Sequence, residues 1–142
     1  MDKRMTSFIK DQKSLCLCTA VNDEPYCANC FYAFLEEDNI LVFKSSEKTR
    51  HILNALVNNR IAGTIVQDLN KIGEITGIQF TGQFAPAVGD ILSKAKMAYY
   101  TKNPMALVMK GELWIISLKY VKLTDNKLGF GNKLVWEGEG SG

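Results

Sequence analysis

The sequence consists largely of short apolar runs rich in β-forming residues, each followed by turn residues. This alternation constrains the fold most, because it predicts many short strands joined by tight turns. The turn Asn22–Pro25 joins the first two runs as a hairpin, and Gly82 inside a long later run predicts a bend or bulge. The predicted strands span Leu15–Val21, Tyr26–Leu35, Ile40–Lys44, Ile61–Val66, Ile75–Pro86, Leu113–Leu118, Tyr120–Thr124 and Leu134–Trp136.

Three further segments carry apolar residues at helical spacing. In the first, Met5, Phe8 and Ile9 predict a short helix that ends near Lys13. The second follows Ser46, a candidate N-cap residue. The second and third helices are predicted over residues 47–58 and 90–101, with Asn103 and Pro104 ending the third.

These elements predict an α+β fold made mainly of antiparallel sheet. A six-stranded barrel with two or three flanking helices fits best, because closing the sheet removes exposed strand edges. The chain has 142 residues, 46% of them apolar, which is enough for one domain with one core. We assign that domain to residues 1–136 and interpret the glycine-rich residues 137–142 as a flexible C-terminal tail.

Charge and hydropathy exclude several classes of function. The 17 basic and 15 acidic residues are spread along the chain, whereas general nucleic-acid binding needs a concentrated cationic face. The apolar runs are shorter than the roughly 20 residues of a membrane helix. The first fifteen residues contain no apolar segment typical of a secretory signal. We therefore expect a cytoplasmic protein without a nucleic-acid or membrane partner.

The segment Phe43–Arg50 is the most informative for function, because a predicted strand there runs directly into a helix through three cations and three hydroxyls. The first turn of a helix offers free backbone N–H groups and a partial positive charge, which together with basic side chains make a phosphate site. An ordinary helix cap with solvated charges has the same spacing. The local pattern alone leaves both interpretations open.

Longer segments carry a resemblance to a known family: Tyr26–Tyr32, Leu41–His51, Ala62–Ile65 and Gly77–Gly82. They resemble the FMN-binding split-barrel superfamily typified by pyridoxamine 5'-phosphate oxidase. Its functionally uncharacterised YhbP-like branch is the more similar part, through Glu47–His51, Gly77–Gly82 and Thr124–Gly131. The resemblance spans about Leu15 to Trp136 and implies a split barrel that binds FMN.

The resemblance also implies which residues contact the cofactor. The second strand would run beside the flavin, basic and hydroxyl residues after the third strand would hold its phosphate, and a glutamine would hydrogen-bond near the ring. Because the family binds flavin between subunits, it implies a homodimer in which Trp136 or Phe130 of the partner completes the site. The implied residues are Ala28, Asn29, Cys30, Lys44, Ser45, Lys48, Thr49, Arg50, Gln79 and Trp136.

The chain departs from pyridoxamine phosphate oxidases proper at two positions. Those enzymes carry an arginine at the start of the second strand and an arginine-bearing C-terminal segment, where this chain has Pro25–Ala28 and Gly129–Lys133. The departures argue against a vitamin B6 substrate and leave the expectation of flavin binding in place.

The four cysteines, Cys16, Cys18, Cys27 and Cys30, have spacings that suggest zinc. Residues three apart on a strand point to opposite faces, so at most three of the four thiols face one ion, and a structural zinc takes four ligands. We therefore expect no metal site and interpret the cysteines as small apolar residues. A cross-strand pair of Cys18 and Cys30 near the flavin is the one redox arrangement we consider.

The only histidine is His51, which excludes a metal site built on several histidines. We expect it to be exposed or to cap the helix. No catalytic residue is evident, and three functions remain: a flavin-dependent oxidoreductase acting on an unidentified small molecule, a non-catalytic flavin- or haem-binding carrier or sensor, and a structural protein without cofactor.

Overall fold

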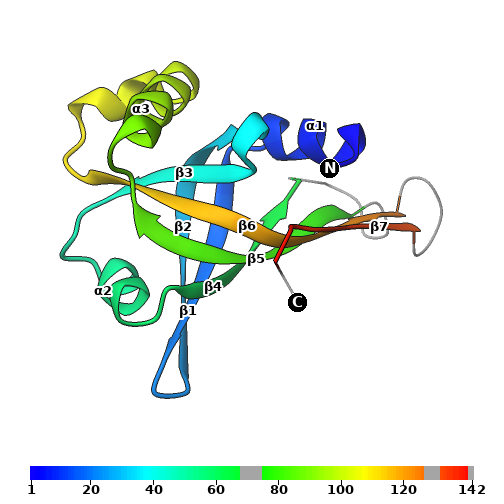
Figure 1. Cartoon of the computed structure of the whole chain (residues 1–142), viewed down its shortest axis with the longest axis horizontal. Helices are drawn as coiled ribbons and strands as arrows, with labels where there is room; N and C mark the ends of the chain where they lie inside the picture. Colours follow the sequence, from blue (N-terminus) through cyan, green and yellow to red (C-terminus); the bar gives the residue numbers. More distant parts are fainter. Residues whose placement is uncertain (68–74, 127–131, 141–142) are drawn as a thin grey trace.

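The computed structural model describes residues 1–67, 75–126 and 132–140. Within these ranges the chain forms seven strands, three α-helices and two short 3-10 helices (Figure 1). The strands are β1 (Ser14–Val21), β2 (Glu24–Leu35), β3 (Ile40–Ser45), β4 (Arg60–Val66), β5 (Thr76–Pro86), β6 (Glu112–Asp125) and β7 (Asn132–Glu137). The helices are α1 (Lys3–Asp11), η1 (Glu36–Asp38), α2 (Arg50–Val57), α3 (Asp90–Lys102) and η2 (Pro104–Val108).

All strand pairs are antiparallel, in the order β3-β2-β1-β4-β5-β6-β7, and a further pairing of β3 with β6 closes the first six strands into a ring. The expectation of a mainly antiparallel, barrel-like fold with flanking helices is confirmed. The strand count of six is not, because β7 lies outside the ring and extends the second half of β6.

A two-residue turn fixes the register of the hairpin β1–β2. Asn22 and Asp23 both have positive φ values, 51° and 62°, which are the conformations of a type I′ turn. The pairing therefore begins with Val21 opposite Glu24 and continues along the whole of β1. Because side chains alternate between faces, this register decides which residues of both strands point into the barrel.

Strand β6 is one continuous strand where the sequence predicts two. The break expected between Leu118 and Tyr120 is a bulge, since Thr81 and Gly82 of β5 pair with Tyr120 and Leu118 and leave Lys119 without a partner on β5. The predicted bulge at Gly82 is confirmed. A Cβ atom at Gly82 would lie only 2.7 Å from side-chain and backbone atoms of β6, which explains the glycine.

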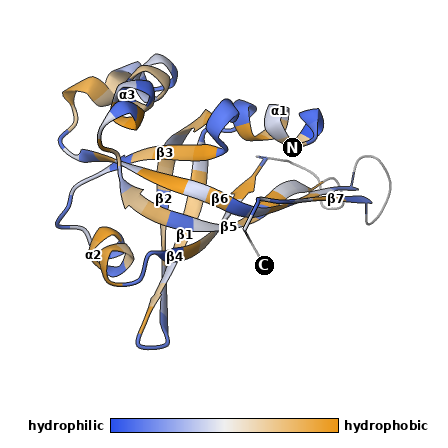
Figure 2. Cartoon of the chain, in the orientation of Figure 1, coloured by the Kyte–Doolittle hydropathy of each residue, from blue (hydrophilic) through white to orange (hydrophobic). Residues whose placement is uncertain are grey.

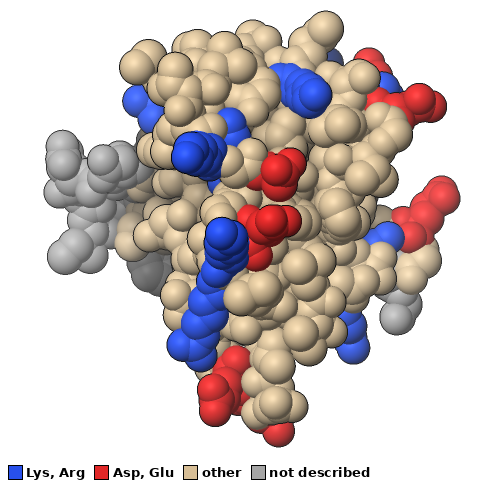
Figure 3. Space-filling model, turned by 90° about the vertical axis from the view of Figure 1, so that its left-hand side faces the viewer, with Lys and Arg blue, Asp and Glu red and all other residues tan. Residues whose placement is uncertain are grey.

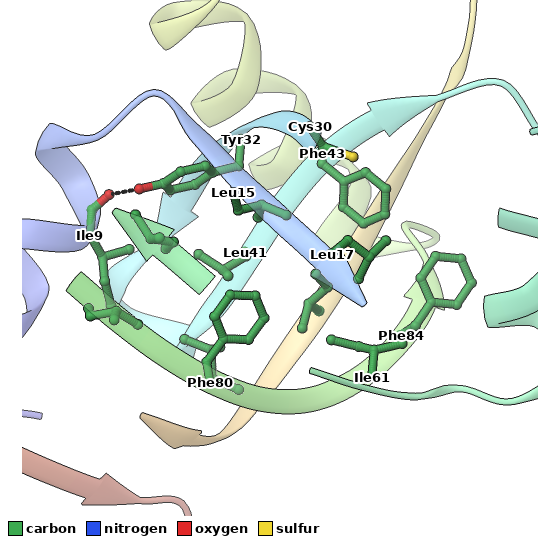
Figure 4. Close-up of a cluster of buried hydrophobic side chains, with 14 of the residues drawn as sticks. Ile9, Leu15, Leu17, Cys30, Tyr32, Leu41, Phe43, Ile61, Phe80 and Phe84 are labelled. Carbon is green, nitrogen blue, oxygen red and sulfur yellow. Dashed lines mark hydrogen bonds between the residues drawn. The ribbon is translucent and has the colours of Figure 1, made fainter. Parts of the chain in front are cut away.

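The barrel interior is filled by one large hydrophobic cluster, which Figure 4 shows in part. Leu17, Leu41 and Phe43 are completely buried there. Helix α1 packs against the cluster through Met5 and Ile9, and the hydroxyl of Tyr32 donates a hydrogen bond to the backbone carbonyl of Ile9 (Figure 4). Hydropathy follows this arrangement, since the ring strands are largely hydrophobic and the hairpin tip is hydrophilic (Figure 2).

Helices α2 and α3 cover different parts of the ring. Helix α2 packs mainly against β1 and buries Ile52 and Ala55. It begins at Arg50 rather than Glu47, and Thr49 replaces Ser46 as N-cap, because Ser46 instead closes a turn with the backbone N–H groups of Lys48 and Thr49. Helix α3 packs against β2 over a second, smaller apolar cluster. It ends at Asn103 as expected.

None of the helices in the described residues is long and apolar enough to span a membrane. The contact predicted for Phe130, parts of the segments Thr124–Gly131 and Gly129–Lys133, and the last two residues of the predicted tail lie outside the described residues.

Candidate functional site

The segment between β3 and α2 forms a compact turn with its own hydrogen bonds. The hydroxyl of Thr49 donates to the carbonyl of Ser46 at 2.8 Å, and the N–H of Lys48 donates to the Ser46 hydroxyl at 3.3 Å. The first-turn N–H groups of a helix lack partners within that helix. Helix α2 begins at Arg50, so the N–H groups of its first turn lie close to Lys48 in the chain. The side chain of Lys48 is exposed.

A polar chain runs from this turn toward the barrel interior. The Ser45 hydroxyl lies 2.8 Å from Nε2 of His51, and the indole N–H of Trp114 donates to the Ser45 carbonyl at 2.9 Å. Burial lowers the pKa of His51, so its ring is neutral at pH 7. Burial also raises the pKa of Cys30 to about 11, against an opposing hydrogen bond from Ser45. Contrary to expectation, His51 is half-buried and bonded to Ser45 rather than exposed or capping the helix.

Lys44 is held away from the turn. Its ammonium donates to the carbonyl of Ala106 in η2 at 2.9 Å and lies 5.0 Å from the centre of the Tyr100 ring. The structure thus connects Lys44 to η2, on a different side of β3 from the helix start.

Arg50 lies over the start of β2. Its guanidinium is 4.3 Å from the centre of the Tyr26 ring and 3.8 Å from a carboxylate oxygen of Glu24. Both contacts are at the surface, where an ion pair contributes little to stability. The side chain is therefore held near the α2 N-terminus but remains available to a stronger anion.

Asn29 and Gln79 occupy the outer face of the barrel on opposite sides of the ring. Both are exposed. They stand in one cross-strand row, in which Asn29 pairs with Cys16, Cys16 with Thr64, and Thr64 with Gln79. In the closed ring, two strands separate β2 from β5 in either direction. Asn29 and Gln79 of one chain therefore face away from each other.

Ala28, Cys30 and Trp136 belong to the inner face. Cys30 is 7% exposed and lies in the large core cluster, and Ala28 is half-buried opposite Leu17. Trp136 pairs with Val121 and packs in part against the same cluster. Of the ten predicted residues, the structure brings together Ser45, Lys48, Thr49, Arg50 and Cys30, and it does not place Lys44, Gln79 or Trp136 beside them.

The described part of the chain has open pockets at its surface, and three of them are lined by none of the ten predicted residues. One of them is a groove of about 820 Å³ across the outer faces of β1, β4, β5 and β6, lined in part by Cys18, Ala62, Thr81 and Tyr120. On the face shown in Figure 3, basic and acidic side chains lie close together, so a ligand there meets charges of both signs.

The cysteines are arranged as strand geometry predicts, with Cys27 and Cys30 on opposite faces of β2. The predicted pair of Cys18 and Cys30 is wrong, because the register places Cys18 opposite Cys27 and Cys30 opposite Leu15. Only Cys30 is buried; Cys16 and Cys18 are half-exposed and Cys27 is exposed. The interpretation of all four as buried apolar residues therefore holds for Cys30 alone.

Sequence reasoning missed three residues that shape the turn. Tyr26 and Glu24 position Arg50, and Trp114 fixes the Ser45 backbone. The β1–β2 register could have placed Tyr26 and Glu24 near the end of the hairpin. No local signal connects Trp114 to Ser45, because they meet only through the long-range pairing of β3 with β6.

A scan against models of known protein families finds no match. Two sequence relatives decide the family. A UPF0306 protein from Photorhabdus laumondii is 37% identical over 130 residues, 92% of this chain and 91% of the relative. A UPF0306 protein from Yersinia pestis is 36% identical over 129 residues, 91% of this chain and 88% of the relative. This chain belongs to the UPF0306 family.

Solved structures share the fold of this UPF0306 chain at low sequence identity. A haem-binding protein from Mycobacterium smegmatis superposes with a TM-score of 0.77 at 18% identity, over 90% of this chain and 54% of that chain. The chain thus spans about half the length of that protein. An FAD-binding protein from Mesorhizobium loti gives a TM-score of 0.68 at 15% identity, over 85% and 92%. These likenesses confirm the split-barrel fold of this UPF0306 protein.

Proposed function

We propose that this UPF0306 protein binds FMN between the subunits of a homodimer and acts as a flavin-dependent oxidoreductase on a small molecule. The observation that carries the proposal is the start of α2, where Lys48 and Arg50 flank the free N–H groups of the first helical turn. Bound FMN would supply the redox chemistry, and the chain would supply position and electrostatics.

The residues of the turn fit a phosphate group. Lys48 and Arg50 are exposed cations, and Arg50 is bound only to a ring face and to a carboxylate 3.8 Å away among its described contacts. Anions bind favourably at helix N-termini, because free N–H groups and the helix dipole act together. Ser45 and Thr49 already use their hydroxyls in the turn, so the two cations and the amides would carry most of the binding.

The position of Gln79 supports a site shared by two chains. Asn29 and Gln79 face away from each other across the ring, so one flavin can contact both only if the partner supplies one of them. The same holds for Trp136, which lies on β7 outside the ring. A homodimer therefore fits the ten predicted residues better than a monomer does.

An exposed apolar segment on the other side of β3 from the α2 turn also supports the dimer. In η2 and just after it, Met105 and Val108 are 80% and 85% exposed, and Leu107 and Met109 are also exposed. Lys44 connects this segment to the end of β3. Contiguous exposed apolar side chains are typical of interaction sites. A second copy of the chain would cover them.

Proteins with this fold include an FAD-binding protein, a haem-binding protein and a haem storage protein from Vibrio cholerae, which supports a flavin- or haem-binding function. Flavin is favoured here because Lys48 and Arg50 at the start of α2 suit its phosphate. The chain's only histidine, one of several residue types that ligate haem iron, also has Nε2 engaged by Ser45. The finer assignments, to the YhbP-like branch and to the cytoplasm, are part of the same proposal.

The phosphate site is tested by flavin titration of a Lys48→Ala/Arg50→Ala double variant. Two charge-assisted hydrogen bonds of roughly 1.5–3 kcal/mol each would be lost, so FMN affinity should fall by about 100-fold or more. Lys13→Ala/Lys96→Ala removes two exposed lysines elsewhere and should leave the affinity unchanged. Equal affinity of the wild type and the first variant would contradict the placement.

A second pair of variants separates ligand binding by Arg50 from its ion pair. Arg50→Ala and Glu24→Gln both remove the contact between Arg50 and Glu24. If Arg50 binds phosphate, only Arg50→Ala weakens FMN binding, and Glu24→Gln leaves it unchanged or tighter. Equal weakening by the two would assign Arg50 a structural role.

Absorption spectroscopy of the protein then distinguishes the functions. Flavin absorption that bleaches with NADH or NADPH without oxygen supports an oxidoreductase, whereas flavin that neither nucleotide reduces supports a carrier. A Soret band after incubation with haem, without flavin binding, would contradict the proposal. Sedimentation of Val108→Glu tests the dimer, because a charge in the interface should yield monomers that no longer retain FMN.

A further inference from the structure

Three thiols gather on the outer face of the hairpin β1–β2, apart from the α2 turn. The Sγ atoms of Cys16, Cys18 and Cys27 all lie within 4.8 Å of one another. Those of Cys18 and Cys27 are 2.9 Å apart. Cys16 and Cys18 are half-exposed and Cys27 is exposed, so the cluster is open to solvent. Cys18 also lines the groove across β1, β4, β5 and β6.

The fold holds these thiols together before any ligand binds. The two-residue turn at Asn22 and Asp23 fixes the register in which Cys18 stands opposite Cys27. Cys16 follows two residues before Cys18 on the same strand and therefore shares its face. A slip of one residue would move every inward side chain of the hairpin to the surface, so the buried core opposes it.

We propose that Cys16, Cys18 and Cys27 bind one thiophilic metal ion, zinc or copper(I), as a three-thiolate site. A zinc–sulfur bond of about 2.3 Å in tetrahedral geometry puts ligand sulfurs roughly 3.8 Å apart. The close pair must therefore open by about 1 Å, and the other two spacings, each at most 4.8 Å, need to change by no more than a similar amount. Rotation about the Cα–Cβ bonds of these side chains, none of which is buried, accomplishes this without moving the strands.

Three protein ligands define an open site. A closed structural zinc site takes four ligands, whereas an open site needs three and leaves one position for water or a substrate. Asn29 stands opposite Cys16 on the same face. Copper(I), as a soft ion, also prefers thiolate ligands.

The residues around the three thiols bear on how a metal cation would bind there in place of the thiol protons. The cross-strand neighbours of the cluster on this face are Asn29, Ala62 and Thr64, none of which is charged. Burial and the hydrogen bond with Cys27 raise the pKa of Cys18 to about 12, and burial raises that of Cys16. Cys16 and Cys18 are therefore protonated at neutral pH. Binding would release their protons and would weaken as the pH falls.

The test uses the full chain, fully reduced, freed of metal and kept without oxygen. Cobalt(II) replaces zinc as a spectroscopic probe, and zinc affinity follows from competition with a chromophoric chelator. A copper(I) chelator gives the corresponding arm for copper. We expect one ion per chain in the zinc titration, the copper(I) titration or both. The cobalt(II) sample should show a thiolate-to-cobalt charge-transfer band. The metal that the protein binds more tightly against its chelator is the one we would assign to the site.

Serine variants assign the ligands. Cys18→Ser and Cys16→Ser should weaken binding by more than the roughly 10- to 100-fold that loss of an outer-shell partner costs. Cys30→Ser is the matched control, because it removes a thiol from the opposite face of the same hairpin and should retain one ion per chain.

Several results would overturn the proposal. One is that the fully reduced protein binds neither zinc, cobalt nor copper(I). This result overturns the proposal even if Cys18 and Cys27 form a disulfide in a sample exposed to air. Another is unchanged affinity in Cys18→Ser, and a third is equal loss in Cys30→Ser. The readout is metal stoichiometry, so failure here leaves the flavin proposal untouched, and failure of flavin binding leaves this site untouched.

Discussion

The two faces of the hairpin β1–β2 differ in what they contribute. The inner face carries Leu15, Leu17 and Tyr32, each at most 1% exposed. The outer face of the same strands carries Cys27, Asn29 and Phe31, all exposed. The inner face is tied to one register by the core, whereas the outer face is exposed at Cys27, Asn29 and Phe31 and is covered by α3 only near the end of β2. The difference teaches that the exposed cysteines of the outer face, which are the candidate metal ligands, are held in place by the packing of the inner face.

The largest expected effect sharpens this comparison with one substitution on each face. Leu17→Ala should lower the free energy of unfolding by about 2–5 kcal/mol, because it leaves a cavity in a fully buried position. Cys27→Ala, on the outer face, should change it by no more than about 0.5 kcal/mol. Urea unfolding measures both. Similar losses of unfolding free energy in the two variants would mean that both faces contribute equally to stability.

Gly63 tests how tightly the inner face is packed. A Cβ atom there would meet the Phe80 ring at 2.3 Å and the Cys16 carbonyl at 2.5 Å. Gly63→Ala should therefore cost roughly 1–3 kcal/mol of unfolding free energy. Gly77→Ala is the control, because its nearest contact would be an ordinary 3.4 Å. Thermal unfolding in which the two variants match would show that the Phe80 ring moves aside freely.

Tyr32→Phe removes the hydrogen bond that connects the inner face to α1. The Ile9 carbonyl loses its donor in a buried position, so the unfolding free energy should fall by about 1–2 kcal/mol. Amide hydrogen exchange should quicken in α1 more than in β4. Uniform quickening along the chain would argue that α1 is not a separately attached element.

The smallest effect concerns His51, beside the α2 turn. Burial lowers its folded-state pKa below the usual 6.5, so the unfolded chain binds the proton more readily. This contribution to stability is present above about pH 6.5 and is lost as the pH falls toward the folded-state pKa. His51→Gln should flatten the loss of stability that begins below about pH 6.5 in urea unfolding. An unchanged slope would mean that other groups cause it.

The sequence predicts most of the elements because each has a local signal. The alternation in β1 and β2 and the turn residues between them locate the hairpin, and Gly82 marks the bulge. The start of α2 was wrong because Ser46 caps a turn as readily as a helix, and the choice depends on hydrogen bonds three residues away. The closing pair β3–β6 has no local signal at all.

For the site, periodicity predicts faces but not partners. The opposite orientation of Cys27 and Cys30 follows from a spacing of three, whereas the pairing of Cys18 with Cys27 depends on the length of the turn. The presence of Lys48 and Arg50 at a strand-to-helix turn was predictable from residue types, although the first helical residue was not. The diversion of Lys44 to η2 was not, because it depends on a carbonyl supplied by a distant segment.

Strand β6 is the last member of the ring in chain order, and within the described residues its first half pairs with β3 and closes the ring. During synthesis, one edge of β3 therefore stays unpaired until residues as far as Ser117 have left the ribosome, and one edge of β5 until residues as far as Asp125 have done so. A chain truncated before β6 would present the unpaired edges of β3 and β5 to other protein molecules. Translation of this protein thus carries an aggregation hazard that ends only when β6 emerges.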